Sequence, residues 1–278
     1  EFMVLDHLLH DMRLFKSNKE AQLMRKAGQV SAQGHIAAMR AVKPGMMEYQ
    51  LEAVYVNPFM QAGCRSSAYP AIVGGGNNAC ILHYTQNDQP LMSGDLVLVD
   101  AGAEYNHYAG DITRTFPVSG RFSAAQRALY EVVLAANKAG IAAVKPGNHW
   151  NDPHVAAVRV LTKGLVKLGL LKGTPAKLVK EQAYRRFYMH RTGHWLGLDV
   201  HDVGDYKVGD EWRLLEPGMA LTVEPGIYIP KGAKGIAKKW QGIGIRIEDD
   251  VLVTKEGAEV MTSQVPKDVE AIELLMAS

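Results

Sequence analysis

Four carboxylates in strongly hydrophobic, strand-like stretches constrain this chain more than any other feature. Asp100 ends the apolar run at residues 96–100, and Asp111 lies in the β-rich stretch 108–117. Glu224 and Glu248 occupy similar places in the second half of the chain. An unpaired, ionised carboxylate that is buried is costly unless its pKa shifts until the group is neutral. The sequence therefore predicts that positive charge lies close to these four acids.

Ion pairs and metal ions are the two ways to supply that charge. A single acid on a strand usually pairs with a lysine or arginine, or faces solvent. The strand-like stretches that carry the four acids contain essentially two cations, Arg114 and Arg246. A metal cluster explains this surplus of acids better than ion pairs do.

Three histidines, His190, His194 and His201, fall within one glycine-punctuated stretch at residues 190–201. A lone histidine is more often a hydrogen-bonded core or surface residue than a ligand, but three beside four buried acids are a different case. One imidazole with four carboxylates makes a hard, oxygen-rich site. Such a site favours manganese, or cobalt or zinc, over the thiolate-rich sites of structural zinc.

The order of the predicted elements indicates an α+β fold, because helices precede strands in each half. Helical patterns and caps predict helices at 17–43, 48–61, 123–144 and 151–170, with Pro58 expected to kink or shorten the second. Strands are predicted at 71–73, 80–83, 95–102, 108–117, 194–200, 220–229 and 243–254. LVLVDAG at 96–102 is echoed by ALTVEPG at 220–226, which suggests two related halves whose acids meet at one central place.

Composition excludes several classes of protein. A net charge of +2 gives no electrostatic basis for binding nucleic acid. The apolar runs are too short to span a bilayer and no signal segment opens the chain, so we expect a cytoplasmic protein that does not bind membranes. We expect one large domain at 17–278. Residues 1–16 are expected to be an N-terminal remnant or a segment added in cloning, because Glu1 and Phe2 precede Met3.

Six motifs resemble those of the aminopeptidase P family of pita-bread metallopeptidases, in register from about residue 12 to residue 275. They are LHYT at 82–85, VDAG at 99–102, YAGDITRTF at 108–116, HWLGLDVHD at 194–202, TVEPGIY at 222–228 and GIGIRIED at 242–249. The resemblance implies a pita-bread fold, with two pseudo-related halves around a curved antiparallel sheet. It also implies release of the first residue from peptides with proline at position 2.

The resemblance implies two divalent ions, usually manganese, and assigns their ligands. Those residues are Asp100, Asp111, His194, Glu224 and Glu248, with Asp111 and Glu248 bridging the ions. A hydroxide shared by the ions would attack the scissile carbonyl.

The resemblance also implies the roles of five residues in turnover. Glu224 would accept the proton and return it to the leaving nitrogen. His83, His190 and His201 match unligated active-site histidines that contact the substrate and the tetrahedral intermediate. Of these, His190 and His201 would stabilise the developing negative charge. Arg246 matches an arginine near the site, although it could equally be the partner of a neighbouring acid.

Three other functions remain open from the sequence alone. A prolidase-type dipeptidase is the nearest alternative and a methionine aminopeptidase a more distant one. The third is a non-catalytic module of the same fold that binds peptides or histones. Members of the aminopeptidase P family normally carry an N-terminal domain that supports oligomers. With residues 1–16 too few to form such a domain, we expect homo-oligomerisation to be weakened.

Overall fold

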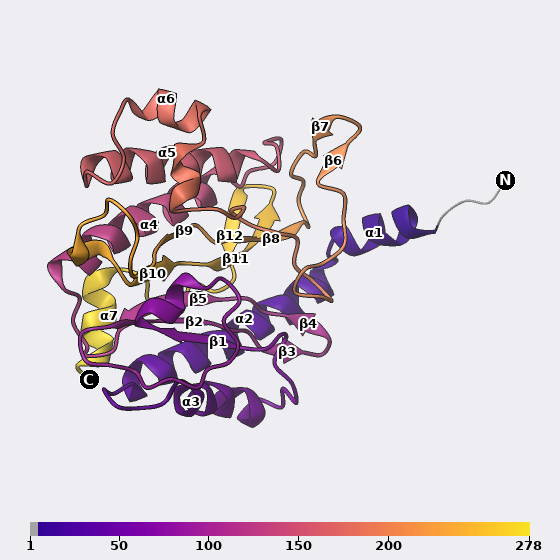
Figure 1. Cartoon of the computed structure of the whole chain (residues 1–278). Helices are drawn as coiled ribbons and strands as arrows, with labels where there is room; N and C mark the ends of the chain where they lie inside the picture. Colours follow the sequence, from indigo (N-terminus) through magenta and orange to yellow (C-terminus); the bar gives the residue numbers. More distant parts are fainter. Residues whose placement is uncertain (1–4) are drawn as a thin grey trace.

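The computed structural model describes residues 5–278; residues 1–4 of the expected N-terminal remnant lie outside the described residues. The strands form a central layer between two helix pairs (Figure 1). Helices α2 (Asn18–Ala41) and α3 (Glu48–Gln61) cover one side, and α4 (Ala124–Ala143) and α5 (Asp152–Lys167) cover the other. The largest core cluster contains side chains from both helix pairs and from the strands, among them Tyr55, Phe116 and Tyr130. The central strands are therefore covered by packed helices.

Serine caps begin two of the long helices where the sequence predicted them. The Ser17 hydroxyl accepts from the Glu20 N–H, and the Glu20 side chain accepts from the Ser17 N–H at 2.8 Å. Ser123 and Gln126 make the same reciprocal pair at α4. Both capping boxes satisfy backbone donors that a helix start leaves unpaired. The helix α3 has the predicted bounds, and Pro58 lies inside it without shortening it.

The first half supplies an antiparallel sheet of β1 (Ile72–Gly75), β2 (Leu96–Asp100) and β5 (Thr113–Pro117), in the order β1-β2-β5. All five residues of β2 are buried, which matches its continuous apolar run. Asp100 lies opposite Thr113 in the register. Asp111 therefore lies just beyond the end of the paired segment, on the same side as Asp100.

The second half repeats this placement with different strands. β8 (Ala220–Val223) pairs with β11 (Asp249–Thr254), which also pairs with β12 (Gly257–Val260); β9 (Gly226–Ile229) pairs with β10 (Ile243–Arg246). Each of the two long strands predicted here is interrupted at an acid. Glu224 lies between β8 and β9, and Glu248 lies between β10 and β11. One cause is Pro225, which has no N–H to donate to a ladder.

Two predicted strands are wrong. Residues 194–200 make only an isolated bridge, Trp195 to Leu221, and otherwise form an irregular loop that packs closely on β8. A Cβ on Gly193 would lie 2.0 Å from the Thr222 carbonyl oxygen, so only glycine allows this approach. Trp195 and Leu196 are buried without forming a ladder, and Leu198 is exposed. Residues 80–83 are also not a strand, because the chain turns through a 3₁₀ helix, η1 (Gly76–Cys80), and then continues irregularly.

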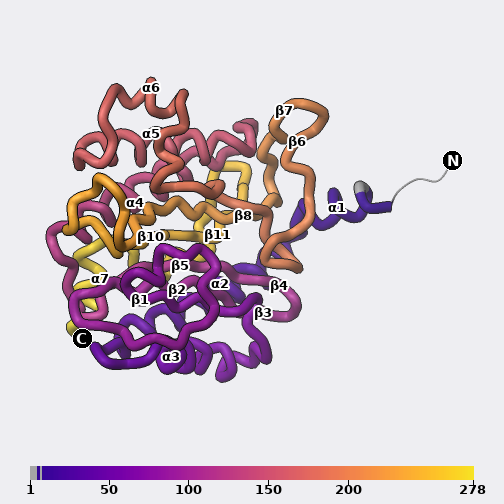
Figure 2. Tube along the Cα trace, viewed as in Figure 1, coloured from indigo at the N-terminus to yellow at the C-terminus, as the bar shows by residue number. Residues whose placement is uncertain are grey.

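The remaining elements are short, and most were not predicted. They are α1 (Asp6–Leu14), β3 (Glu104–Tyr105), β4 (Tyr108–Ala109), α6 (Pro175–Lys180), η2 (Ala183–Arg186), β6 (Lys207–Val208), β7 (Glu211–Trp212), η3 (Lys238–Trp240) and α7 (Val269–Met276). The Cα trace shows that α1 extends from the body close to the loop of β6 and β7 (Figure 2). Within residues 5–278, no helix has the length and apolarity needed to cross a bilayer.

Candidate active site

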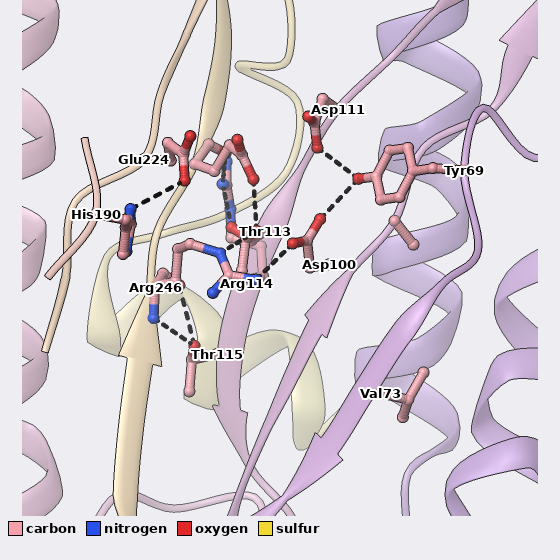
Figure 3. Close-up of polar contacts among 12 residues, drawn as sticks. Tyr69, Val73, Asp100, Asp111, Thr113, Arg114, Thr115, His190, Glu224 and Arg246 are labelled. Carbon is pink, nitrogen blue, oxygen red and sulfur yellow. Dashed lines mark hydrogen bonds and ion pairs between the residues drawn. The ribbon is translucent and has the colours of Figure 1, made fainter. Parts of the chain in front are cut away.

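One cavity of about 450 Å³ brings together all nine residues that the family resemblance assigned to metal binding or turnover. Its lining includes Asp100, Asp111, Glu224, Glu248, His83, His190, His194, His201 and Arg246. Several of these side chains point toward one another from strand ends and loops (Figure 3). The two halves of the chain thus deliver their acids to one place, as the echo between them predicted.

Asp100 and Asp111 are joined by a tyrosine that the sequence analysis did not identify. The Tyr69 hydroxyl lies 2.7 Å from Asp100 Oδ1 and 2.5 Å from Asp111 Oδ1 (Figure 3). A phenol has one proton, so it donates to one carboxylate at a time. Burial raises the pKa of Asp111, although the nearby imidazole of His194 opposes this shift. The Asp111 main chain is fixed separately, because its N–H donates to Asp250 Oδ2 at 3.0 Å.

Arg246 is a buried cation that contacts one of the four acids directly. Its Nη2 lies 2.5 Å from Asp100 Oδ2, and its Nη1 donates to the Tyr228 hydroxyl at 2.9 Å. The Tyr228 hydroxyl is 2.8 Å from His190 Nε2, and His190 Nδ1 is 2.7 Å from the Arg191 carbonyl. Burial, reinforced by the charge of Arg246, lowers the pKa of His190 to about 3. His190 is therefore a neutral imidazole with a partner on each ring nitrogen.

Glu248 is buried with a hydroxyl rather than a cation as its nearest partner. The Thr113 hydroxyl lies 2.5 Å from Glu248 Oε2, and Arg246 Nε donates to the same hydroxyl oxygen at 3.1 Å. Burial raises the pKa of Glu248 well above its usual range, and Asp111 adds to this shift. Without a further cation, ionised Glu248 is unfavourable here.

His194 directs one of its two ring nitrogens, Nε2, toward the acids. Its Nδ1 lies 2.9 Å from the Trp195 carbonyl, which can only accept, so Nδ1 carries a proton. Nε2 lies 3.3 Å from Asp111 Oδ2 and 3.9 Å from Glu224 Oε1. Ligand atoms of Asp111, His194 and Glu248 all lie within 4.8 Å of one another, close enough to share a metal ion. A backbone carbonyl that fixes the far nitrogen is the usual support of a metal-binding histidine.

Glu224 has the weakest direct partners of the four acids. Its Oε2 is 3.5 Å from His190 Nδ1, which is beyond a good hydrogen bond (Figure 3). Burial raises the pKa of Glu224 to about 7, and the charges of His194 and Arg246 only partly oppose the shift. Its main chain is held firmly, because its N–H donates to the Thr192 carbonyl at 2.8 Å.

The carboxylates around the cavity outnumber the lysine and arginine side chains that pair with them, which favours a metal site. Among the described residues, no lysine or arginine forms a salt bridge with Asp111, Glu224 or Glu248. Arg114, the second cation expected near the acids, instead pairs with Asp249 at 2.7 Å. Asp111, Glu248 and the half-buried Glu224 thus share a cavity with His194, whose Nε2 faces Asp111. This donor set fits divalent ions that accept oxygen and imidazole ligands.

His83 and His201 are more exposed and lie toward solvent. The His201 ring packs edge-on against the His194 ring, with centroids 4.4 Å apart. Burial lowers the pKa of His201, and the neighbouring His194 lowers it further. Among residues 5–278, no hydrogen bond to either nitrogen of His201 is found, so the ring is free to contact a molecule in the cavity.

Three residues that contact this centre were not assigned by the sequence analysis. Thr113 and Tyr228 lie within the quoted motifs, and alternation gave a signal for both. Thr113 is two residues from Asp111, and Tyr228 is four from Glu224, which are same-face spacings on strands. Tyr69 has no such signal, because it lies in an irregular segment 31 residues from Asp100.

Comparisons with known proteins agree with this geometry. The sequence profile of metallopeptidase family M24 matches residues 22–255. The chain is 52% identical to the Xaa-Pro aminopeptidase of Haemophilus influenzae over 269 residues, which cover 97% of this chain and 62% of that protein. It is 38% identical to the human Xaa-Pro dipeptidase over 314 residues, covering 100% of this chain and 64% of that protein.

A solved structure shows the same fold. The aminopeptidase PepP of Pseudomonas aeruginosa superposes with a TM-score of 0.99 at 59% identity, over 100% of this chain and 63% of that one. This likeness confirms the predicted α+β pita-bread fold. The chain spans somewhat less than two thirds of the length of these proteins. With the family profile matched over most of its length, the chain belongs to metallopeptidase family M24.

Proposed function

We propose that this chain carries the catalytic centre of a metal-dependent Xaa-Pro aminopeptidase, which releases the first residue of peptides with proline at position 2. The observation that carries the proposal is the surplus of buried carboxylates around one cavity. Asp111, Glu224 and Glu248 lie around Nε2 of His194 with no lysine or arginine partner among the described residues, and Arg246 pairs with Asp100. The match to family M24 and the likeness to Xaa-Pro aminopeptidases support the same function.

In this proposal the cavity holds two divalent ions, with Mn²⁺ favoured and Co²⁺ or Zn²⁺ as alternatives. Asp100, Asp111, His194, Glu224 and Glu248 would be their ligands, with Asp111 and Glu248 shared. When bound, such ions lower the pKa of water and polarise a carbonyl oxygen. The carboxylates offer hard oxygen donors and His194 a single nitrogen, which suits Mn²⁺ better than Mg²⁺.

Glu224 is the residue that moves the proton. Its carboxyl group has a pKa near neutral in the metal-free protein because it is buried, and it has no close hydrogen-bond donor on its side chain. A carboxylate placed in this way can take a proton from water and return it to the leaving nitrogen. The Thr192 carbonyl and the start of β9 keep the main chain of Glu224 in place while this occurs.

The histidines bind and orient the peptide. His201 faces the cavity with its ring nitrogens free, so it is the best-placed donor for an oxygen that becomes negative. The predicted share of His190 in that role has less support, since its nitrogens already contact Tyr228 and Arg191. His83 lies on the rim, where it can contact the substrate. Arg246 acts mainly on Asp100 and Tyr228.

The proposed preference for proline follows from the missing N–H of the peptide bond that precedes it. A peptide bond before proline has no N–H, so the cavity needs no acceptor there and must admit a ring. The lining supplies apolar surface for a compact side chain, from Tyr69, Pro70, Ile72, Leu82 and Val200. Peptides are therefore the proposed partners of this cavity.

A panel of three peptides tests the proposal. The Mn²⁺-loaded protein is incubated with Arg-Pro-Pro, Ala-Pro and Met-Ala-Ser, and release of the first residue is measured. Cleavage of Arg-Pro-Pro is the expected result. Cleavage of Ala-Pro alone would identify a prolidase-type dipeptidase, and cleavage of Met-Ala-Ser alone a methionine aminopeptidase. Metal binding with no cleavage of any peptide would indicate a non-catalytic peptide-binding module.

A further inference from the structure

A second polar cluster lies behind the acids, outside the cavity, and has no role in the chemistry described so far. Its centre is Asn137 on α4, whose side chain is completely buried. Asn137 Nδ2 lies 3.0 Å from the Val223 carbonyl oxygen and 3.2 Å from the Ile247 carbonyl oxygen. These two residues immediately precede Glu224 and Glu248. One amide group thus joins the two main-chain segments that carry the second-half acids.

The orientation of this amide is determined by its partners. The two backbone carbonyls can only accept, so the NH₂ group must face them. On the other side, Lys267 Nζ lies 2.8 Å from Asn137 Oδ1, and an ammonium group can only donate. Asn137 therefore uses both donors and its oxygen at once. Neither an aspartate nor an aliphatic side chain of the same size could make both donated bonds.

Lys267 connects Asn137 to a buried ion network that returns to Glu248. Lys267 Nζ lies 2.6 Å from Asp249 Oδ2, and Asp249 Oδ1 accepts from Arg114 Nη2 at 2.7 Å. Arg114 Nη1 lies 2.5 Å from the carbonyl oxygen of Glu248. The carbonyl groups of Ile247 and Glu248 are thus both bound by this one cluster. Arg114 Nε has no partner, but Asn137, Lys267 and Asp249 have no buried side-chain nitrogen or oxygen without one, and such networks make a structure locally rigid.

The pairing between the two segments that Asn137 joins is interrupted at the two glutamates. Val223 pairs with Asp249 on one side of the break, and Gly226 pairs with Arg246 on the other. Between these ladders the N–H groups of Glu224 and Glu248 donate to Thr192 and Thr113 instead of to each other, and the Ile247 N–H donates to the Pro225 carbonyl at 3.3 Å. Asn137 adds two bonds at this interruption, from a helix that packs on the sheet.

We propose that Asn137 is a positioning residue that fixes the separation of Glu224 and Glu248 and so prepares the site for its metal ions. This inference rests on the proposed function, in which both glutamates are metal ligands. Residues that orient metal ligands without touching the metal typically contribute 10- to 100-fold in metal affinity. Asn137 differs from the usual case because it holds the main chain rather than the ligand side chain.

The test measures Mn²⁺ binding to metal-free protein by calorimetry, for wild type, Asn137→Leu and Asn137→Asp. Leucine keeps the approximate shape and removes every polar contact. Aspartate keeps the acceptor for Lys267 and removes the two donated bonds. In both variants we expect the Kd of the more weakly held ion to rise about 10- to 100-fold. The electron paramagnetic resonance signal of coupled Mn²⁺ pairs should weaken in parallel.

Two controls separate positioning from general loss of stability. Leu161→Ala removes a fully buried side chain from α5 and lowers the melting temperature without touching the strands of the site. Its Kd for Mn²⁺ should stay within about twofold of wild type. Lys267→Met leaves both donated bonds of Asn137 in place, so its Kd should rise less than that of Asn137→Leu.

The outcomes are distinct. A Kd within about twofold of wild type in Asn137→Asp, or an equal rise in Leu161→Ala, would overturn the role of Asn137. If Asn137→Leu does not fold, the Kd of Asn137→Asp decides the question. If neither variant folds, Lys267→Met decides it. A Kd for Mn²⁺ in Lys267→Met equal to that of Leu161→Ala would then overturn the proposed network. Wild-type protein that binds no Mn²⁺ would contradict the proposed function itself.

Discussion

The carboxylates and the unligated histidines of the cavity are held in different ways. The carboxylate floor, Asp100, Asp111, Glu224 and Glu248, lies at strand ends and strand breaks in the centre of the molecule. The histidine wall, His83, His190 and His201, lies in irregular segments. Strand ends are positioned by ladders and by helices packed on them, whereas a loop depends on a few side-chain contacts. The floor is therefore the more rigid part of the site.

The loops of the wall are fastened by buried acids of their own. Glu48 accepts from the Tyr84 hydroxyl at 2.8 Å and from the Gln89 N–H at 3.0 Å, which holds the segment that carries His83. Asp202 lies beside His201 and receives the buried ammonium of Lys16 at 3.1 Å. These carboxylates have protein partners and need no metal. Within the floor, Asp100 pairs with Arg246, whereas Asp111, Glu224 and Glu248 have no lysine or arginine partner among the described residues. The difference teaches that these three acids are exceptional because they have fewer partners, not because they are buried.

If this contrast is functional, removal of metal should abolish the reaction rather than slow it. We expect complete loss of turnover of Arg-Pro-Pro after exhaustive chelation, and recovery with Mn²⁺ that exceeds recovery with Mg²⁺, because His194 offers an imidazole that Mg²⁺ uses poorly. Activity is measured against metal content determined by elemental analysis. Full activity in metal-free protein would show that the carboxylates of the floor do not act by binding a catalytic metal ion.

Within the floor, Glu224 should have the largest effect on turnover of any single side chain. Glu224→Gln keeps the shape and removes the base, so kcat should fall at least about 10²-fold while the circular dichroism spectrum stays unchanged. Single-turnover kinetics at saturating Mn²⁺ make the measurement. A variant that keeps more than about a tenth of the wild-type rate would contradict the assignment of Glu224 as the base.

A change in the wall should slow turnover without releasing metal. His201→Ala should lower kcat by about 10²-fold and change KM little, because its bond strengthens as charge develops on the substrate oxygen. Metal content by elemental analysis should equal that of wild type. Loss of metal in His201→Ala would place His201 among the ligands and remove the distinction between floor and wall.

The smallest expected effect is the dependence of metal affinity on pH. Burial alone lowers the pKa of His194, but the neighbouring Asp111 outweighs it and raises the pKa to about 9. A metal ion must displace this proton, so affinity for Mn²⁺ should increase up to about tenfold per pH unit as the pH rises toward 9. Glu224, with its pKa raised to about 7, adds to this slope below neutral pH.

Calorimetry in buffers of different ionisation enthalpy measures the protons released. Release of one or more protons per bound ion at pH 7 is the expected result. Asn137→Leu should change affinity at every pH without changing this slope, since neither asparagine nor leucine titrates. An affinity for Mn²⁺ that is independent of pH from 6 to 9 would show that metal binding does not displace a proton from His194.

The sequence predicted the floor because its signal is local. Asp100, Asp111, Glu224 and Glu248 each stand out against apolar neighbours, and four acids with two cations indicate a missing charge. Element order was sufficient for the α+β class, and the resemblance to a known family supplied the pita-bread fold. The capping box at Ser17 and Glu20 was predicted because a cap involves residues three positions apart.

The parts that the sequence did not predict depend on contacts between distant residues. Residues 194–200 have the composition of a strand, yet the close packing of Gly193 on Thr222 prevents a regular ladder. Tyr69 and Asn137 were not identified because each acts across the fold. Asn137 is separated by 86 residues from Val223 and by 110 from Ile247. A buried asparagine in a helix gives no sign in the sequence of which carbonyls it meets.

The contacts of Arg246 also give a direction to the protons around His190. The Arg191 carbonyl can only accept, so neutral His190 carries its hydrogen on Nδ1, and its Nε2 accepts from the Tyr228 hydroxyl. The Tyr228 oxygen in turn accepts from the guanidinium group of Arg246, which has no acceptor. Every hydrogen in this chain of contacts therefore points the same way, from Arg246 through Tyr228 and His190 to the Arg191 carbonyl.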